Sequence, residues 1–239
     1  GGNKNLNEKN FKFWYLNNPT KSYSLWKVEQ SSTIEGYATT NNFFYTVNGE
    51  AKLAALPQNV LTSENIRGKG MFGKLYQQTE VENLEVNNVD FFLTSTGAMS
   101  TPIFLAKFGY VKAISPVVLV KLPSLNTLFS KKKYRLLNDI KEIKMTSNIN
   151  LNNSRKKTPE YFFWRYSSCE KENLRIIEVV DNEKIIGYAF LIVKRKFGIK
   201  AVILADILTS SENNYTPIID ACHSHVSKRL FAPMIMIKI

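Results

Sequence analysis

The sequence has very little cysteine and no residue spacing typical of a metal site. Only Cys169 and Cys222 occur among its 239 residues, too few for a disulfide framework, and this usage is typical of a reducing compartment. No Cys-x-x-Cys pair is present. The two histidines, His223 and His225, stand two positions apart, a spacing at which helical side chains do not share a face. The sequence therefore predicts no metal site and disfavours a paired acid–base role for the histidines.

Long apolar runs are also absent. The longest, such as Val117 to Val120 and Met234 to Ile237, fall far short of the ~20 residues that a membrane-spanning helix needs. The opening residues also do not predict a signal peptide. With 44% hydrophobic and 12% aromatic residues, the chain has enough apolar mass for one large core or two smaller ones. We expect a folded, cytoplasmic protein without a membrane span, and a disordered tail or a coiled coil is excluded.

Acidic residues are scarce relative to basic ones. The chain carries 32 Lys and Arg against 20 Asp and Glu, a net charge of +12, and the stretch 131–157 alone contributes 9 basic and 2 acidic residues. This stretch is also rich in asparagine between Asn148 and Asn153. It is typical of a connector, which is either a solvated surface segment or a docking surface for an anionic partner such as nucleic acid.

An internal repeat predicts the architecture. Three pairs of segments match in the same order, at offsets of 150, 151 and 147 residues. The matched pairs are Phe13-Trp14 with Phe163-Trp164, Ile34 to Ala38 with Ile185 to Ala189, and Asn59 to Ser63 with Asp206 to Ser210. Near-equal offsets indicate two copies of one α/β unit. We therefore expect a domain over 3–122, the basic connector over 123–157, and a shorter second domain over 158–239.

Each copy reads as a short aromatic helix followed by β-rich segments and a helix. The expected strands of the first copy are 23–29, 34–47, 51–61, 89–93 and 110–120, with a second helix near Pro102 to Phe108. Those of the second copy are 174–180, 184–194, 199–208 and 234–239. Asn48-Gly49 predicts a type I′ hairpin turn between two of these strands.

A glycine-rich string stands where the third strand of the first copy meets its helix. It runs from Arg67 to Lys74 as Arg-Gly-Lys-Gly-Met-Phe-Gly-Lys. Glycines let a backbone turn sharply and bring its N–H groups close to a ligand, and the helix that follows adds a positive N-terminal dipole. The string lacks the Gly-Lys-Ser/Thr ending of a Walker A loop and the βαβ setting of a dinucleotide site. It predicts a phosphate cradle.

The order strand, Arg-x-x-Gly, helix, strand, helix resembles the acetyl-CoA-dependent N-acyltransferases of the GNAT superfamily. The segment Asn59 to Phe72 resembles the core of a tandem branch of that superfamily, and Thr101 to Tyr110 resembles its later helix and the turn that ends it. The stretch Phe163 to Tyr166 is similar to the start of a second, degenerate unit. The resemblance implies two tandem α/β units, each a mixed, mostly antiparallel twisted sheet flanked by helices, with the second unit incomplete.

The same resemblance implies acetyl-CoA, or another short acyl-CoA, as co-substrate. Its pantetheine arm would lie along Leu61 and Thr62, and its pyrophosphate on the backbone N–H groups of the cradle. The cradle comprises Arg67, Gly68, Lys69, Gly70, Met71, Phe72 and Gly73. The sequence departs from the family pattern at Phe72, where Gly or Ala is usual and where the larger ring crowds the loop.

Acid–base groups are harder to assign. Many family members place a tyrosine acid at the position of Leu105, and strand 51–61 contains no carboxylate that could serve as a base. The polar candidates of this strand, Gln58 and Asn59, can orient a water molecule but cannot take up a proton. Asp206, which is aligned with Asn59 in the second copy, supplies a carboxylate, although an aspartate at a strand end is more often a cap or anchor. Asn59 and Asp206 are the candidate catalytic residues.

The resemblance predicts transfer of an acetyl or short acyl group to a primary amine, with an amino-sugar, free or nucleotide-linked, as the first acceptor class. Two alternatives stay open. A Fem-like transferase would take its acyl group from charged tRNA, which suits the basic connector but not the intact cradle. A non-catalytic protein would keep the CoA site as a sensor or scaffold. The sequence does not identify the acceptor or the oligomeric state.

Overall fold

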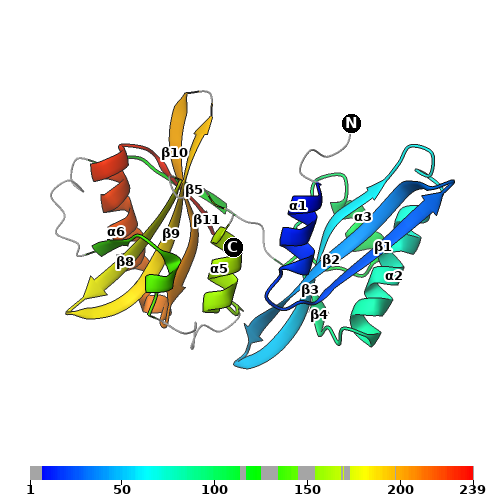
Figure 1. Cartoon of the computed structure of the whole chain (residues 1–239), viewed down its shortest axis with the longest axis horizontal. Helices are drawn as coiled ribbons and strands as arrows, with labels where there is room; N and C mark the ends of the chain where they lie inside the picture. The colour runs from blue at the N-terminus through cyan, green and yellow to red at the C-terminus, as the bar shows by residue number, and fades with distance from the viewer. Residues whose placement is uncertain are drawn as a thin grey trace. The chain divides into compact units, whose positions relative to one another are not determined.

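The computed structural model describes residues 7–113, 117–124, 134–144, 154–167, 169, 173–196 and 198–238. The chain forms two compact units, Gly1–Ile103 with Asn152–Lys156, and Phe104–Leu151 with Lys157–Ile239. The basic run Lys131 to Lys133 and the asparagines Asn148 to Asn153, which were expected to form a connector, lie outside the described residues. Each unit contains one sheet flanked by helices (Figure 1).

The first unit is built on a sheet whose strands run in the order β1-β2-β3-β4, with β7 paired to β2. Only β3 and β4 pair in parallel; the other neighbours are antiparallel. Its strands are β1 (Tyr23–Gln30), β2 (Thr33–Val47), β3 (Glu50–Thr62), β4 (Phe91–Phe92) and β7 (Ser154–Arg155). Its helical elements are α1 (Glu8–Phe11), η1 (Lys12–Leu16), α2 (Met71–Glu85) and the start of α3 (Thr101–Lys107).

Alternation along β2 sends neighbouring side chains to opposite faces of this sheet. Thr39 points toward the N-terminal turn η1, where its hydroxyl meets Tyr15. Thr40 points the other way, to Asn83 on α2. The predicted hairpin turn is also confirmed, because Asn48 and Gly49 both have positive φ, at 51° and 86°, as a type I′ turn requires. Two helical layers therefore cover opposite faces of the first sheet.

The second unit holds a sheet in the order β5-β11-β10-β9-β8-β6. It too is mostly antiparallel, with β10 and β11 as its parallel pair. Its strands are β5 (Val117–Lys121), β6 (Tyr134–Leu137), β8 (Leu174–Asp181), β9 (Lys184–Lys196), β10 (Ile199–Thr209) and β11 (Met234–Lys238). Its helical elements are η2 (Ile140–Glu142), α5 (Pro159–Ser167), η3 (Glu212–Asn214), α6 (Tyr215–His225) and η4 (Val226–Leu230).

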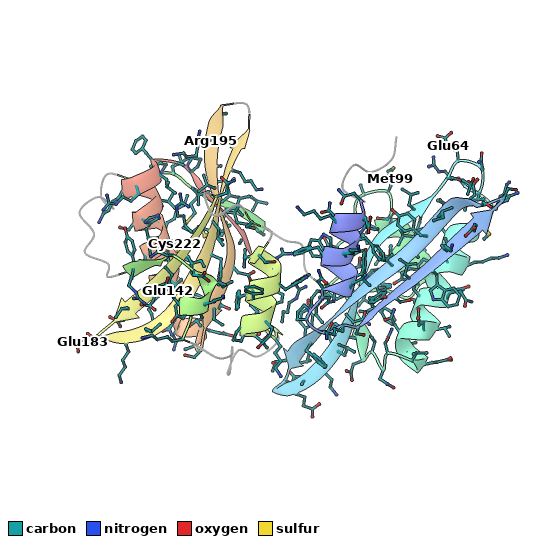
Figure 2. The ribbon with its side chains drawn as sticks, in the orientation of Figure 1. Glu64, Met99, Glu142, Glu183, Arg195 and Cys222 are labelled. Carbon is teal, nitrogen blue, oxygen red and sulfur yellow. The ribbon has the colours of Figure 1, made fainter. Side chains whose placement is uncertain are left out.

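Helices cover both faces of the second sheet in the same manner. Residues of one parity on β9, such as Ala189 and Leu191, belong to the apolar core that includes Ile218 and Cys222 of α6, where Cys222 is labelled in Figure 2. Phe190, of the other parity, stacks on Phe162 and Tyr166 of α5, at ring centroid distances of 4.5 and 4.7 Å. The mixed, mostly antiparallel α/β class expected from the sequence is confirmed.

Two details differ from the sequence-based expectation. Residues 110–120 were expected to close the first copy, yet β5 (Val117–Lys121) pairs with β11 in the second sheet. The segment 89–93 yields only the two-residue strand β4. The expected connector also contributes strands: β6 pairs with β8, and β7 pairs with β2. Segments between the two copies therefore complete the sheets rather than only linking them.

Three basic residues of the expected connector have partners inside a unit. The guanidinium of Arg155 lies 4.6 Å from the ring centroid of Phe43 and donates to the hydroxyl of Tyr45 at 3.0 Å. Arg135 pairs with the buried Glu178 at 3.1 Å, and Lys157 forms an ion pair with a carboxylate of β10 that is described below. These three side chains are therefore held by partners within a unit, although the Arg135 side chain is still 54% exposed.

Candidate functional site

The glycine string forms a tight loop between the end of β3 at Thr62 and the start of α2 at Met71. Gly68 and Gly70 have positive φ, at 78° and 74°, and Gly70 is the N-cap of α2. Residues with a side chain adopt this left-handed region only at a cost, and glycine adopts it freely. The sequence therefore shapes the backbone here as the phosphate-cradle interpretation requires.

The cradle is open on the side where its glycines lack side chains. A Cβ atom added at Gly68, Gly70 or Gly73 would meet no heavy atom within 4 Å. The first hydrogen bond of α2 that includes its N-cap runs from Lys74 N to Gly70 O, at 3.2 Å. The N–H groups of a first helical turn have no acceptor within the helix, so those of Met71 and Gly73 project from the N-terminus of α2.

The charges around the cradle favour an anion. Arg67, Lys69 and Lys74 are exposed, and the first turn of α2 contains no acidic residue. The guanidinium of Arg67 donates to the carbonyl of Thr62 at 3.4 Å, which ties the cradle to the last residue of β3. Cationic side chains and a helix dipole therefore converge on one open loop.

Glu35 anchors the loop that leads into the cradle. The residue is 8% exposed, and its carboxylate accepts hydrogen bonds from the hydroxyl of Ser63 and from the amide of Asn65, the latter at 3.2 Å. These bonds, with the charge of Lys69, hold the pKa of Glu35 below its usual value. Glu64, between the two anchored residues, is labelled in Figure 2. The loop is therefore fixed at its start and open at its glycines.

Phe72 was expected to crowd the cradle, and the structure shows where its ring lies instead. The ring is parallel to that of Tyr76 one turn later, at a centroid distance of 6.4 Å. Tyr76 is fully buried, so Phe72 packs along α2 toward a core residue. Its side chain takes a place in the helix packing, while the open space belongs to Gly68, Gly70 and Gly73.

The last part of β3 lacks a strand partner on one edge. The parallel pairing with β4 covers only Ala54 and Ala55, and no described strand continues that edge to Thr62. On its other edge β3 carries a bulge, because Tyr37 pairs with Leu61 whereas Thr39 pairs with Gln58. Apart from the Thr62 carbonyl, which accepts from Arg67 at 3.4 Å, no described strand uses the backbone groups on this edge near Leu61 and Thr62. An extended, amide-containing ligand could pair with such an edge, which suits the pantetheine expected there.

The bulge brings Asn59 into a polar network that sequence reasoning missed. Asn59 has φ of 51°, and its amide Nδ2 donates to the hydroxyl of Tyr15 at 2.9 Å. Tyr15 is 1% exposed, and burial raises the pKa of its phenol. A signal for it existed, since an offset of 151, that of the Gly36 and Gly187 segments, aligns Tyr15 with Tyr166.

Asp206, the second candidate catalytic residue, lies in the second unit and occupies the corresponding position on β10. Its Oδ1 pairs with Lys157 Nζ at 2.5 Å and its Oδ2 accepts from the Tyr166 hydroxyl at 2.7 Å. Its side chain is only 9% exposed. Since Asn59 belongs to the first unit, neither unit contains both candidates, and a catalytic role for Asp206 stays a prediction.

The later helix of the resemblance ends as expected. Gly109 has φ of 66°, and Tyr110 N bonds to Phe104 O at 3.3 Å, the pattern of a helix closed by a left-handed glycine. Leu105, at the position of the family tyrosine, is 42% exposed. This position therefore offers no acid.

The two copies match in structure at their third strand and following helix. Gly36 lies opposite Thr62, and Gly187 lies opposite Thr209. A Cβ at Gly36 would meet Leu75 of α2, and one at Gly187 would meet Ile218 of α6. Both third strands also contain a bulge, the one in β10 between Leu204 and Asp206.

The loop before the helix differs between the copies. Carrying the repeat offset forward places Tyr215 to Ala221 opposite the cradle Arg67 to Gly73, but these seven residues lie within the helix α6. The stretch between β10 and α6 is only 210–214 and contains no glycine. The correct counterpart of the cradle is therefore this shorter loop, and Asp220 on α6 pairs with Lys121 at 3.1 Å.

His223 and the two repeat tryptophans, Trp14 and Trp164, have surroundings that fit a role in packing. His223 lies 2.7 Å from the carbonyl of Leu122, Trp164 is buried, and Trp14 is half-buried. Among the described residues no cluster of three His, Cys, Asp or Glu side chains could hold a metal ion. In the same part of the chain, no helix is long and apolar enough to cross a membrane.

No protein-family model and no curated protein matches the chain, whereas solved structures do. A probable N-acyltransferase of unknown function from Enterococcus faecalis superposes with a TM-score of 0.68 at 12% identity, over 90% of this chain and 55% of that one. A GCN5-related N-acetyltransferase from Anabaena variabilis gives 0.64 at 15% identity, over 95% and 57%. Yeast N-myristoyltransferase with bound myristoyl-CoA, from Saccharomyces cerevisiae, gives 0.53 at 9% identity, over 88% and 62%.

The likeness extends over most of this chain, while the chain spans between 55% and 62% of the length of those three proteins. At identities this low the shared feature is the fold. The resemblance read from the strand, Arg-x-x-Gly loop and helix is confirmed at that level. The chain has the fold of the GCN5-related N-acetyltransferases.

Proposed function

We propose that the first unit binds acetyl-CoA or another short acyl-CoA and transfers the acyl group to a primary amine. The observation that carries this proposal is the conjunction of two features at one end of β3. The cradle of Gly68 and Gly70 opens at the N-terminus of α2, and among the described strands none pairs with the neighbouring edge of β3 beyond Ala55. The first suits a pyrophosphate and the second suits the amides of pantetheine.

The comparisons support the same assignment. Two of the similar structures are described as a probable N-acyltransferase and a GCN5-related N-acetyltransferase, and the third holds myristoyl-CoA. In the proposed reaction the amine nitrogen attacks the thioester carbonyl, a C–N bond forms and the C–S bond breaks. The thiolate leaves, and the amine proton passes to water or to the thiolate. An amino-sugar, free or nucleotide-linked, is the proposed acceptor class.

Each residue of the site has a defined part in this proposal. Backbone N–H groups from Arg67 to Gly73 bind the pyrophosphate, although those of Arg67 and Lys69 would first have to leave the Glu64 and Ile66 carbonyls, at 3.4 and 3.3 Å. Leu61 and Thr62 contact the pantetheine arm. Asn59 orients the attacking amine, since an amide can hold an N–H without removing its proton. The proposed acyl-CoA domain, expected over 3–122, is centred on the first unit, since β5 within that range pairs in the second sheet. Residues 158–239 are the proposed degenerate copy. Asp206 would act in catalysis only if its ion pair with Lys157 opens.

Substitution at Gly70 tests the cradle. Gly70→Asp places a carboxylate where phosphates would lie and strains a backbone at φ of 74°, so acetyl-CoA binding measured by calorimetry should be lost. Gly49→Asp is the matched control, because Gly49 also has positive φ and open surroundings but lies in the hairpin turn. Folding of both variants is checked by circular dichroism. Unchanged affinity in folded Gly70→Asp, or equal loss in both variants, would overturn the cradle assignment.

A further inference from the structure

The polar network at the β3 bulge is a chain of hydrogen bonds with one direction. It joins Asn59 Nδ2 to the Tyr15 hydroxyl at 2.9 Å and that hydroxyl to Thr39 Oγ1 at 2.7 Å. The Thr39 hydroxyl then bonds to the backbone carbonyl of Gln58. Tyr15 and Thr39 are 1% and 3% exposed, so water does not compete for these bonds.

The carbonyl at the end of the chain sets the direction of every proton. A carbonyl oxygen only accepts, so the single proton of the Thr39 hydroxyl is committed to Gln58 O. Thr39 Oγ1 therefore accepts the hydroxyl proton of Tyr15, and this bond uses the one proton that the Tyr15 hydroxyl has. The Tyr15 oxygen is left as an acceptor, and Asn59 must offer it an N–H rather than its carbonyl oxygen. Burial raises the pKa of Tyr15, which keeps the phenol protonated as this arrangement requires.

The consequence falls on the exposed side chain of Asn59. With Nδ2 held by Tyr15, the amide cannot exchange its nitrogen and oxygen, and Oδ1 takes a fixed place. In the described part of the chain Oδ1 has no hydrogen-bond partner, and Asn59 itself is exposed. It lies on the segment of β3 whose edge is open beyond Ala55. An acceptor oxygen is thus held at the end of the strand proposed to contact pantetheine.

The second copy shows the alternative arrangement. Its tyrosine, Tyr166, donates to a carboxylate oxygen of Asp206 at 2.7 Å, and the other oxygen is held by Lys157 at 2.5 Å. Here each carboxylate oxygen has a partner inside the unit, and the Asp206 side chain is only 9% exposed. At equivalent positions, the first copy therefore has a tyrosine bound to an asparagine, and the second has a tyrosine and a lysine bound to an aspartate.

We propose that Tyr15 is a positioning residue that fixes the amide of Asn59, so that Asn59 Oδ1 accepts a hydrogen bond from the attacking amine. This inference rests on the proposed function. It deepens the proposed function, because an oxygen that only accepts requires a nucleophile with a hydrogen to donate, such as the N–H of an amine, and leaves the nitrogen lone pair free for attack. Asn59 takes up no proton in this role. Thr39 acts through Tyr15, and neither residue contacts the substrate.

The orientation of the amide can be measured without any ligand. In protein labelled with ¹⁵N-asparagine, one side-chain N–H of Asn59 should exchange slowly with solvent, and the signal is assigned by its absence in Asn59→Ala. Tyr15→Phe should make that exchange as fast as in an exposed asparagine. Tyr37→Phe is the matched control, since Tyr37 is half-buried near Tyr15 and does not bond to Asn59. A fast-exchanging Asn59 amide in the wild-type protein would overturn the proposal.

Kinetics test whether the positioning matters for transfer. Release of CoA from acetyl-CoA is followed with glucosamine as the amine probe, and acetyl-CoA affinity is measured separately by calorimetry. Tyr15→Phe and Asn59→Ala should each lower kcat about tenfold, the loss expected for one hydrogen bond, without changing acetyl-CoA affinity. The double variant should lose little more, because both changes remove one interaction.

The outcomes separate this inference from the proposed function. If acetyl-CoA does not bind, the proposed function fails, while the exchange experiment still decides whether Tyr15 fixes Asn59. If acetyl-CoA binds but wild type releases CoA no faster than Tyr15→Phe, the positioning role is overturned. An increase in the KM of glucosamine with unchanged kcat would also contradict it, because the role concerns the attacking nitrogen and not general affinity.

Discussion

Asp206 offers the sharpest test of what the second copy does, because its carboxylate is held by two partners within one unit. Lys157 Nζ lies 2.5 Å from Oδ1 and the Tyr166 hydroxyl 2.7 Å from Oδ2, with side-chain exposures of 20% for Lys157 and 9% for Asp206. Asp206→Ala leaves the ammonium of Lys157 with only the Ile207 carbonyl at 3.3 Å. Breaking a buried pair from one side costs about 3 to 5 kcal/mol.

The one-fifth exposure of Lys157 places the expected loss near the lower end, at about 3 kcal/mol. Lys157→Met should cost a similar amount, since it leaves a buried carboxylate with the neutral Tyr166 hydroxyl but without its cation. The double variant removes both charges together, so its loss should be smaller than the combined single losses by about 2 kcal/mol. The cycle thereby measures how strongly the two side chains depend on one another.

Tryptophan fluorescence can report on the second unit alone. The chain contains Trp14, Trp26 and Trp164, and only Trp164 lies on α5 of the second unit, where it is 5% exposed. In a Trp14→Phe, Trp26→Phe background, urea unfolding followed at Trp164 gives the stability of each member of the cycle. Additive losses would refute the ion-pair reasoning. A fully stable Asp206→Ala variant that loses acyl transfer would instead favour Asp206 as a base.

Two further predictions concern stability. Gly187→Ala should destabilise its unit by about 1 to 3 kcal/mol, because the new Cβ would lie 2.6 Å from Ile218 Cδ1 and from the Leu208 carbonyl. Gly36→Ala should cost less, because the nearest atom to its new Cβ would lie 3.0 Å away. Equal shifts of the urea midpoint in the two variants would contradict this packing argument. Burial, together with the charges of Arg175 and Arg229, lowers the pKa of His225 from 6.5 to about 4. Within the described chain its ring nitrogens have no hydrogen-bond partner, and the ring packs edge-on against Tyr134. As the pH falls, the His225 imidazole is therefore protonated in the unfolded chain before it is protonated in the folded protein. The free energy of unfolding should then decrease between pH 6.5 and 4. This decrease should be smaller in His225→Phe, and an equal decrease in wild type and variant would contradict the prediction.

The sequence predicts the fold best where the local pattern and the internal repeat agree. The Asn48-Gly49 turn and the glycine string each specify a local geometry, and both appear at their expected place. Most of the expected strands do so too, but 89–93 is reduced to Phe91–Phe92. Matched offsets then imply two similar units. The partner of β5 could not be predicted in this way, because the apolar run Val117 to Val120 fits the edge of either sheet, and only tertiary pairing with β11 decides.

In the candidate site, too, the features set by consecutive residues could be predicted and those set by tertiary contacts could not. The cradle is local, so its glycines and helix start follow from consecutive residues. The bond between Tyr15 and Asn59 joins residues 44 positions apart, and it depends on a bulge that pattern analysis does not locate. The counterpart of the cradle in the second copy was misplaced for a related reason, because the loop 210–214 is shorter and a fixed offset cannot follow a deletion.

The central claim is that the first unit alone holds an acyl-CoA, and the number of acetyl-CoA molecules bound per chain tests it most directly. Calorimetric titration, confirmed by native mass spectrometry, should give one molecule per wild-type chain and none in Gly70→Asp, with Gly49→Asp binding as wild type. The basis is the contrast between the open glycine cradle before α2 and the short, glycine-free loop before α6. Two molecules per chain, or one that persists in folded Gly70→Asp, would contradict the account.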